Sequence, residues 1–180
     1  MGARTTIRIK QEYNKEAVHY YSHWGGDEIH KILAEGLQLA KQAGRLNDEA
    51  YASRIIFDTL VQSGLPDNPD KQWLDHHRTH GFGIIIGDNQ VPFDIGYATP
   101  CVEWVGNNIS PALSSTAEIP TNGEPIIYTL PLEAYEGHFV DDTNLGMVET
   151  YLTHNNAIVQ VYTVDEFISK YSTNDLTLAG

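Results

Sequence analysis

The pattern of apolar and polar residues divides the chain into a helical first part and a β-rich second part. In residues 27–43 apolar side chains recur three and four positions apart, which is typical of one face of an α-helix, and Gly44 ends the run. A second helix is predicted over residues 47–62, with Asn47 as its N-cap and apolar side chains around most of its circumference. We therefore expect two consecutive helices, the second largely buried.

Alternating segments precede and follow these helices. Thr5–Ile9 and Val18–Tyr21 predict two short opening strands. The stretch 64–80 has the composition of a loop that could hold one helical turn, and 109–123 that of an exposed excursion. Further strands and a short helix are predicted at 82–86, 101–105, 125–130, 147–154, 157–163 and 164–171, with a hairpin turn at Asn155-Asn156.

This order of elements predicts an α+β fold. Two N-terminal helices pack on a mainly antiparallel sheet, built largely from residues 82–163, with a C-terminal hairpin and a short terminal helix. The chain of 180 residues is long enough for a single domain over residues 1–172, followed by a frayed tail over 173–180. With 41% hydrophobic residues, the chain needs neither a metal nor a disulfide in order to fold.

The net charge and the cysteine content limit the classes of partner and the cellular location that we expect. Eleven Lys and Arg residues against 24 Asp and Glu residues give a net charge of −13. This charge repels phosphate backbones and anionic bilayers, so we expect neither nucleic acid nor a membrane as a partner. A single cysteine, Cys101, and the lack of an apolar leader favour a reducing, cytoplasmic location.

The sequence carries no ready-made catalytic motif. It has neither a Gly-x-Ser-x-Gly nucleophile elbow nor a phosphate-binding glycine loop. His76, His77 and His80 form a compact histidine cluster, but no second set of metal ligands is legible, so we predict no catalytic metal and no cofactor. Cys101 lies in an apolar run and is expected to be a packed core thiol.

An unusual segment is 20–27, where aromatic residues lead into two glycines and a helix start. The rings of Tyr21 or Trp24 suit stacking on a planar ligand, and free amides at Gly25-Gly26 suit an anion. The acidic side chains of Asp27 and Glu28 oppose an anion there, so a packed aromatic corner is the alternative interpretation.

Two further features complete a candidate ligand site. Arg54 lies on the second, mostly apolar helix, where its guanidinium needs a partner: either Asp58, four residues on, or a bound phosphate or carboxylate. Glycines on both sides of Phe82 allow close approach of a ligand, or a β-bulge. The predicted ligand-binding residues are Tyr21, His23, Trp24, Gly25, Gly26, Arg54, His80, Phe82 and Gly83.

The same segments resemble a family of small phage and prophage proteins without an established function. The likeness spans residues 18–162 and lies in Tyr21-Ser22-His23-Trp24-Gly25-Gly26, Arg54-Ile55-Ile56-Phe57, Gly81-Phe82-Gly83-Ile84 and Glu149-Thr150-Tyr151. Phe82 stands where the family has a tyrosine, which removes a hydroxyl group. The resemblance implies a phage context, with the cytoplasm of an infected or lysogenic bacterium as the location, rather than a particular activity.

Three classes of function stay open. The first is a non-enzymatic binding protein for a small anionic planar ligand; sequestration of a nucleotide-derived host immune signal, an anti-defence function, is one concrete version. The second is an acidic protein-interaction module, either a virion component or an inhibitor of a basic host protein. The third is a metal-dependent hydrolase of a small substrate. Formation of a homo-oligomer is compatible with all three.

Overall fold

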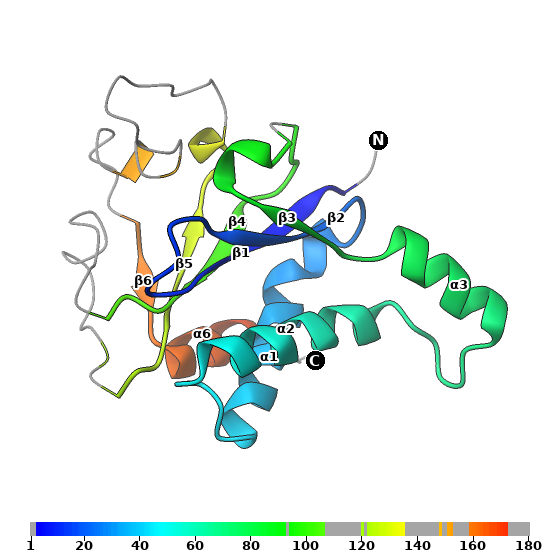
Figure 1. The fold of residues 1–180 in the computed structure, drawn as a ribbon, viewed down its shortest axis with the longest axis horizontal. Helices are drawn as coiled ribbons and strands as arrows, with labels where there is room; N and C mark the ends of the chain where they lie inside the picture. The colour runs from blue at the N-terminus through cyan, green and yellow to red at the C-terminus, as the bar shows by residue number, and fades with distance from the viewer. Residues whose placement is uncertain are drawn as a thin grey trace.

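The structure is a computed structural model that describes residues 3–92, 94–106, 120, 122–135, 148, 151–152 and 159–172. A six-stranded sheet carries helices on one face (Figure 1). The helices of this layer are α1 (Ile29–Gln42), α2 (Glu49–Ser63) and α6 (Val164–Tyr171), whereas α3 (Lys71–His80) projects to the side. The predicted α+β fold is thus confirmed.

The sheet is mixed but mainly antiparallel, with the strand order β3-β2-β1-β4-β5-β6. Only β1 and β4 run parallel among the described pairs, and this pairing joins the N-terminal strands to the later ones. Three short 3-10 helices, η1, η2 and η3, lie in the connections. The bounds are β1 (Thr5–Lys10), β2 (Val18–Ser22), β3 (Gly83–Ile86), β4 (Thr99–Glu103), β5 (Ile126–Leu130), β6 (Val161–Tyr162), η1 (Gly26–Glu28), η2 (Asp88–Gln90) and η3 (Leu132–Ala134).

The central strands of the sheet are buried on both faces. Successive side chains of a strand point to opposite faces, so Ile7, Ile9 and Tyr20 pack under the helices. Cys101 and Tyr128 belong to a second apolar cluster on the other face. Residues that a half-buried strand would expose to water are therefore buried as well.

The close approach of α1 and α2 depends on Gly36. A Cβ atom at this position would lie 3.2 Å from the Cα atom of Ile56 and 3.4 Å from the Oγ1 atom of Thr59. We predict that Gly36→Leu lowers the free energy of unfolding by about 1–3 kcal/mol, because the added side chain must separate the two helices. Urea denaturation measures the change, with the exposed Glu35→Leu as control. A Gly36→Leu protein as stable as the wild type would contradict the close approach.

The second helix is buried along one face rather than all round. Its buried residues are Ala52, Ser53, Ile56, Thr59 and Leu60. Tyr51, Arg54 and Asp58 are exposed, so the prediction of a largely buried helix is wrong. Small and aromatic side chains made the helix apolar on nearly every side, although only one of these sides meets α1 and the sheet.

Residues 64–80 contain the ten-residue helix α3 rather than a loop with one turn. The carboxylate of Asp70 caps it by accepting a hydrogen bond from the Trp73 amide at 2.8 Å. Asp75 accepts from Lys71 at 2.7 Å and from Arg78 at 2.9 Å. Because none of its residues is buried, α3 has no apolar periodicity from which it could be predicted.

The C-terminal hairpin differs from the prediction in its first arm. Val148, Tyr151 and Leu152 are helical and buried, where a strand was expected. Their spacing of three and four residues places them on one helical face. β6 supplies the second arm and pairs with β5. The Asn155-Asn156 turn, nearly all of 109–123 and the tail 173–180 lie outside the described residues.

Candidate functional site

A cavity of about 370 Å³ lies between α3 and the end of β2. The turn after β2, the end of α2, α3 and the link to β3 form most of its wall, and α1 adds one residue. A volume of this size suits a small ligand. The lining residues are Ser22, Trp24, Gly25, Glu28, Ile32, Leu60, Ser63, Gly64, Trp73, His76, His77, His80, Gly81 and Phe82.

The turn after β2 presents Trp24 to this cavity. Gly25 has a φ angle of 96°, in the left-handed region that favours glycine, so the chain changes direction sharply after Trp24. The Trp24 amide donates to the Oγ atom of Ser22 at 3.0 Å. The Trp24 residue is 63% exposed, and its indole therefore offers a large surface for stacking.

His77 holds α3 against the end of α2. Its Nε2 atom donates a hydrogen bond to the carbonyl oxygen of Val61 at 2.6 Å. A Cβ atom at Gly64 would lie 2.7 Å from the Cε1 atom of His77, and one at Gly81 would lie 3.2 Å from the same atom. The two glycines therefore leave the space that the imidazole ring fills.

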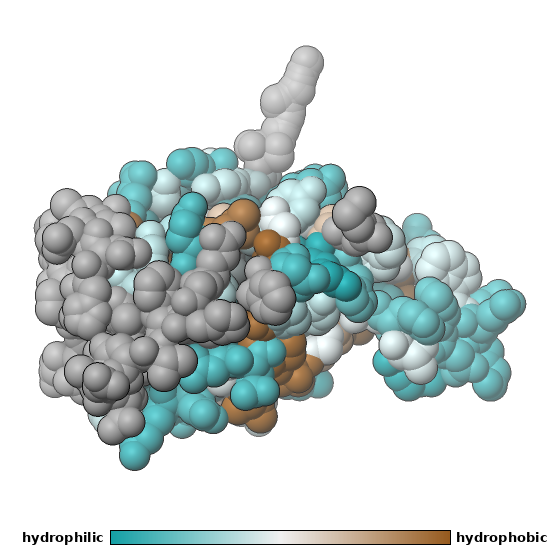
Figure 2. Space-filling view, turned by 90° about the horizontal axis from the view of Figure 1, so that it is seen from above, coloured by the Kyte–Doolittle hydropathy of each residue, from teal (hydrophilic) through white to brown (hydrophobic). Residues whose placement is uncertain are grey.

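Trp73, His76 and His80 form an aromatic row on the cavity side of α3. Their spacing of three and four residues places them on one helical face. The rings of His76 and His80 stack with centroids 4.2 Å apart and planes 11° apart. Trp73 meets His76 edge-on, with centroids 6.4 Å apart. Apart from Leu74, the rest of the projecting helix is hydrophilic, in keeping with the mostly teal right-hand side of Figure 2.

The ionisable side chains of the described lining are three histidines and one glutamate. Glu28 is the acidic residue of the described lining, which contains no lysine or arginine. The turn amides are largely engaged: besides the amide of Trp24, that of Gly26 donates to Ala3 at 3.2 Å and that of Glu28 to Gly25 at 3.1 Å. These amides are not free to hold an anion, so an anionic group at this site depends on histidine.

Four of the nine predicted site residues line the cavity, namely Trp24, Gly25, His80 and Phe82. Gly26 lies instead against the ring of Tyr97, which leaves no room for a Cβ atom at this position. Gly83 opens β3 and lies outside the lining.

Tyr21, His23 and Arg54 also lie away from this cavity. Tyr21 alternates with Ser22 on β2 and points to the other face, where its hydroxyl lies 3.4 Å from the Nδ1 atom of His23. The Nε atom of Arg4 donates to the same nitrogen at 3.1 Å. Arg54 is exposed on α2, and the ion pairs of the described residues do not include it.

The ligand-binding residues predicted from the sequence do not include Trp73, His76 and His77. Two features of the sequence point to these residues. Asp70 is a residue type that caps helices well, and the aromatic residues after it, Trp73, His76, His77 and His80, are three and four positions apart. Together these signals indicate a short helix with its rings on one side.

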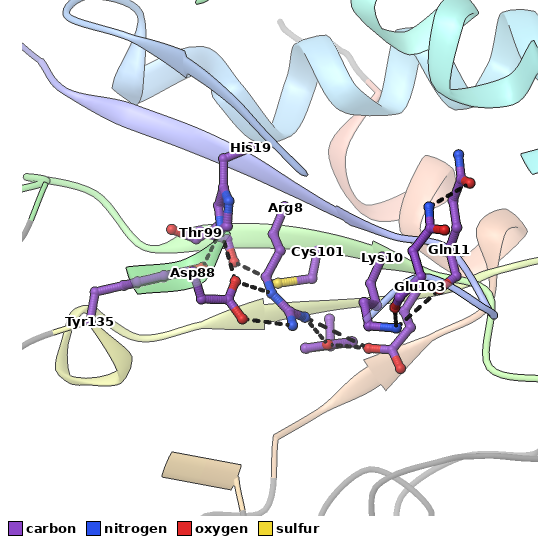
Figure 3. Close-up of polar contacts among 11 residues, drawn as sticks. Arg8, Lys10, Gln11, His19, Asp88, Thr99, Cys101, Glu103 and Tyr135 are labelled. Carbon is purple, nitrogen blue, oxygen red and sulfur yellow. Dashed lines mark hydrogen bonds and ion pairs between the residues drawn. The ribbon is translucent and has the colours of Figure 1, made fainter. Parts of the chain in front are cut away.

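A second polar group, the buried network, lies on the sheet face away from α1 and α2 (Figure 3). Strand register places His19, Arg8, Cys101 and Tyr128 in one row across β2, β1, β4 and β5. Arg8 donates from Nε and Nη2 to Asp88, at 2.8 Å and 3.2 Å. Its Nη1 atom donates to the Tyr128 hydroxyl at 2.9 Å, and this hydroxyl donates to Glu103 at 2.6 Å.

In the buried network Arg8 forms ion pairs with Asp88, at 2.8 Å, and with Glu103, at 3.8 Å. Burial alone would raise the pKa of Asp88, but the hydrogen bond from His19 and the Arg8 guanidinium hold it well below its usual range. Burial lowers the pKa of His19 despite the nearby carboxylate. The ionised Asp88 carboxylate can only accept hydrogen bonds, so the Nε2 atom of His19 donates to it at 3.2 Å. The same nitrogen lies 3.0 Å from the Tyr135 hydroxyl.

The groups of this network are shielded from solvent. Arg8 is 1% exposed, and His19 and Cys101 are fully buried, so a substrate has no direct access to these groups. Burial raises the pKa of the Cys101 thiol to about 12, which suppresses the reactive thiolate. The thiol is packed in the core, as its apolar sequence surroundings predict.

Among the described residues, no group of three or more His, Cys, Asp or Glu side chains is placed to hold a metal ion. Nor does this part of the chain contain a helix long and apolar enough to cross a bilayer. No protein-family model, curated protein or solved structure matches the sequence. The resemblance to phage proteins therefore stays a prediction.

Proposed function

We propose that this protein binds a small planar ligand in the cavity beside α3 and releases it unchanged. The observation that carries the proposal is the gathering of aromatic side chains at one cavity. Trp24 is 63% exposed and Trp73 is 49% exposed, and both line it together with Phe82. Water-exposed indoles carry a hydrophobic cost, and a stacked planar ligand removes this cost while gaining ring contacts.

The ligand that we favour is anionic and nucleotide-like. His76 and His80 supply the ring N–H groups that donate to phosphate or to a base, since the Nε2 atom of His77 already donates to Val61. Glu28 supplies an acceptor for an exocyclic amine. These groups act locally against the net charge of −13, which opposes the approach of an anion.

The two serine hydroxyl groups that line the cavity are not arranged as catalytic nucleophiles, which favours a binding function over an enzymatic one. The Oγ atom of Ser22 accepts from the Trp24 amide, and that of Ser63 donates to the Leu60 carbonyl oxygen at 2.6 Å. Neither is hydrogen-bonded to a histidine in the described structure, as an activated nucleophile would be. In the phage context that the resemblance implies, this binding sequesters a nucleotide-derived host immune signal.

The test is titration of the purified protein with cyclic and linear nucleotides, including NAD-derived ones. We expect a panel member to quench tryptophan fluorescence and to be recovered unchanged after denaturation. Trp24→Ala and Trp73→Ala should each weaken its binding by about 1–2 kcal/mol, because each removes a stacking ring. Isothermal titration calorimetry measures the affinities.

Arg54→Ala is the matched comparison, because Arg54 lies outside the cavity and is exposed. This variant should bind as tightly as the wild type. A loss of affinity confined to Arg54→Ala would move the site to the exposed side of α2. Failure of the whole panel to bind, or recovery of a chemically altered ligand, would overturn the proposed function.

A further inference from the structure

β3 is an edge strand with an uncharged sequence. It lies at one end of the strand order, and in the part of the chain that the structure describes it pairs with β2 alone. The segment 83–87 reads Gly-Ile-Ile-Ile-Gly and contains neither a charge nor a proline, in a chain with a net charge of −13. Natural proteins usually protect an edge with charges, proline or a covering segment. The sequence of this edge offers no such protection.

The hydrogen bonds of β3 show which backbone groups face outward. The Gly87 amide donates to the Ala17 carbonyl oxygen at 2.9 Å, and Ile85 lies opposite His19 in the same register. Because bonded and unbonded residues alternate along an antiparallel ladder, the N–H and C=O groups of Ile84 and Ile86 point to the outer side.

The side chains of the same two residues are exposed apolar surface. Ile84 is 57% exposed and Ile86 is 61% exposed. Ile84 lies beside Tyr20 in the register, so both isoleucines belong to the sheet face that the helices cover further inward. The edge therefore combines outward-facing backbone groups with an apolar strip that the helix layer does not cover.

We propose that a second copy of this chain pairs with the outer side of β3. The segment 83–87 reads the same in both directions, so antiparallel pairing about a two-fold axis at Ile85 sets Ile84 opposite Ile86 of the second copy. Each of the two Ile84–Ile86 pairs exchanges two backbone hydrogen bonds, and their side chains meet on one face. The two sheets become one continuous sheet.

The charges beside the edge are complementary in this arrangement. The Oε1 atom of Glu16 would lie 3.5 Å from a Cβ atom at Gly87, which places this carboxylate at one end of β3. Arg78 belongs to the last turn of α3, just before the other end, where it also pairs with Asp75 of its own helix. Antiparallel pairing brings the Gly83 end of one copy to the Gly87 end of the other, so Arg78 lies at the end of the strand that meets Glu16 of the opposite copy.

The test is the mass of the purified full chain by size-exclusion chromatography with light scattering, over a range of concentrations. We expect a species of twice 20.1 kDa for the wild type. Ile84→Lys and Ile86→Lys should each return the chain to a monomer of 20.1 kDa, because the lysine ammonium would be buried against an isoleucine. Both positions are exposed in the monomer, and circular dichroism checks that the variants are folded.

Leu39→Lys is the matched control, since Leu39 is an exposed apolar residue on α1, away from the edge. It should leave the dimer intact. Glu16→Arg should weaken the dimer, and adding Arg78→Glu should restore it. A wild type that stays monomeric, assembles beyond two copies, or remains dimeric in both isoleucine variants would overturn the proposal. A dimer strengthened by Glu16→Arg alone would overturn the antiparallel register.

Discussion

Replacing Arg8 by methionine is expected to lower the free energy of unfolding by about 3–5 kcal/mol. Arg8 is 1% exposed, and its guanidinium donates to Asp88 and Tyr128. Methionine fills much of the same volume, but it leaves the Asp88 carboxylate without its cation. A buried, unpaired charge is costly, whereas a buried pair roughly balances its own desolvation. Urea denaturation at neutral pH measures the loss.

Arg4 supplies the matched control for this experiment. It also forms an ion pair with an aspartate, Asp94, but its side chain is 32% exposed. Solvent screens such a pair, so Arg4→Met should change the free energy of unfolding by less than about 1 kcal/mol. Adding Asp88→Asn to Arg8→Met removes the unpaired charge and should recover part of the loss. Equal costs for Arg8→Met and Arg4→Met would show that the buried network does not stabilise the fold.

A helix or strand could be predicted where one of its faces is buried, because apolar residues then recur at a regular spacing along the sequence. α1 contacts both α2 and the sheet, so its apolar residues recur at helical spacing, and the prediction for residues 27–43 matches Ile29–Gln42. The terminal helix was placed at its observed bounds, and Thr163 and Glu166 form a capping box at its start. α3 buries none of its residues, so only the cap residue Asp70 and the spacing of the aromatic rings indicate a helix there.

The candidate site could be predicted only in part, because neighbouring residues of a strand point to opposite faces. Tyr21 and Trp24 are close in the sequence, yet Trp24 lines the cavity and Tyr21 points to the other face of the sheet. The sequence did not show that β2 continues through Ser22 before it turns. The sequence places Arg54 on a helix that is apolar almost all round, whereas its side of α2 is exposed.

The buried network had no sequence signal at all. Alternation along β1 suggests that Arg8 points to water, since its neighbours Ile7 and Ile9 are apolar. Its main partner, Asp88, lies 80 residues further along the chain. The two residues meet because η2 follows directly after β3, which is two strands away from β1. Such a pair depends on sheet order, which local periodicity does not encode.

His30 is expected to make the protein less stable as the pH falls from neutral to about 4. It lies on α1, with its Nε2 atom 3.1 Å from the Oγ1 atom of Thr129 and its ring 4.8 Å from that of Tyr171, between centroids. Burial, together with the nearby ammonium group of Lys170, lowers the pKa of His30 to about 4. The folded protein therefore holds this imidazole in its neutral form.

The sign of the effect follows from the protons bound by each state. An unperturbed histidine has a pKa of about 6.5, so between about pH 6.5 and 4 the unfolded chain binds a proton at His30 that the folded chain does not. Falling pH thus favours the unfolded state, and the loss reaches about 2–3 kcal/mol at the lower end of this window. Thermal or urea denaturation at a series of pH values measures it.

His30→Gln removes this titration and should flatten the dependence of stability on pH. The flattening is expected to be incomplete, because burial also lowers the pKa of His19, and that imidazole must gain a proton when the chain unfolds in acid. Asp88 limits the contribution of His19, since its carboxylate favours the protonated ring. An unchanged slope in His30→Gln would show that His30 is protonated in the folded protein, with the Thr129 hydroxyl as its acceptor.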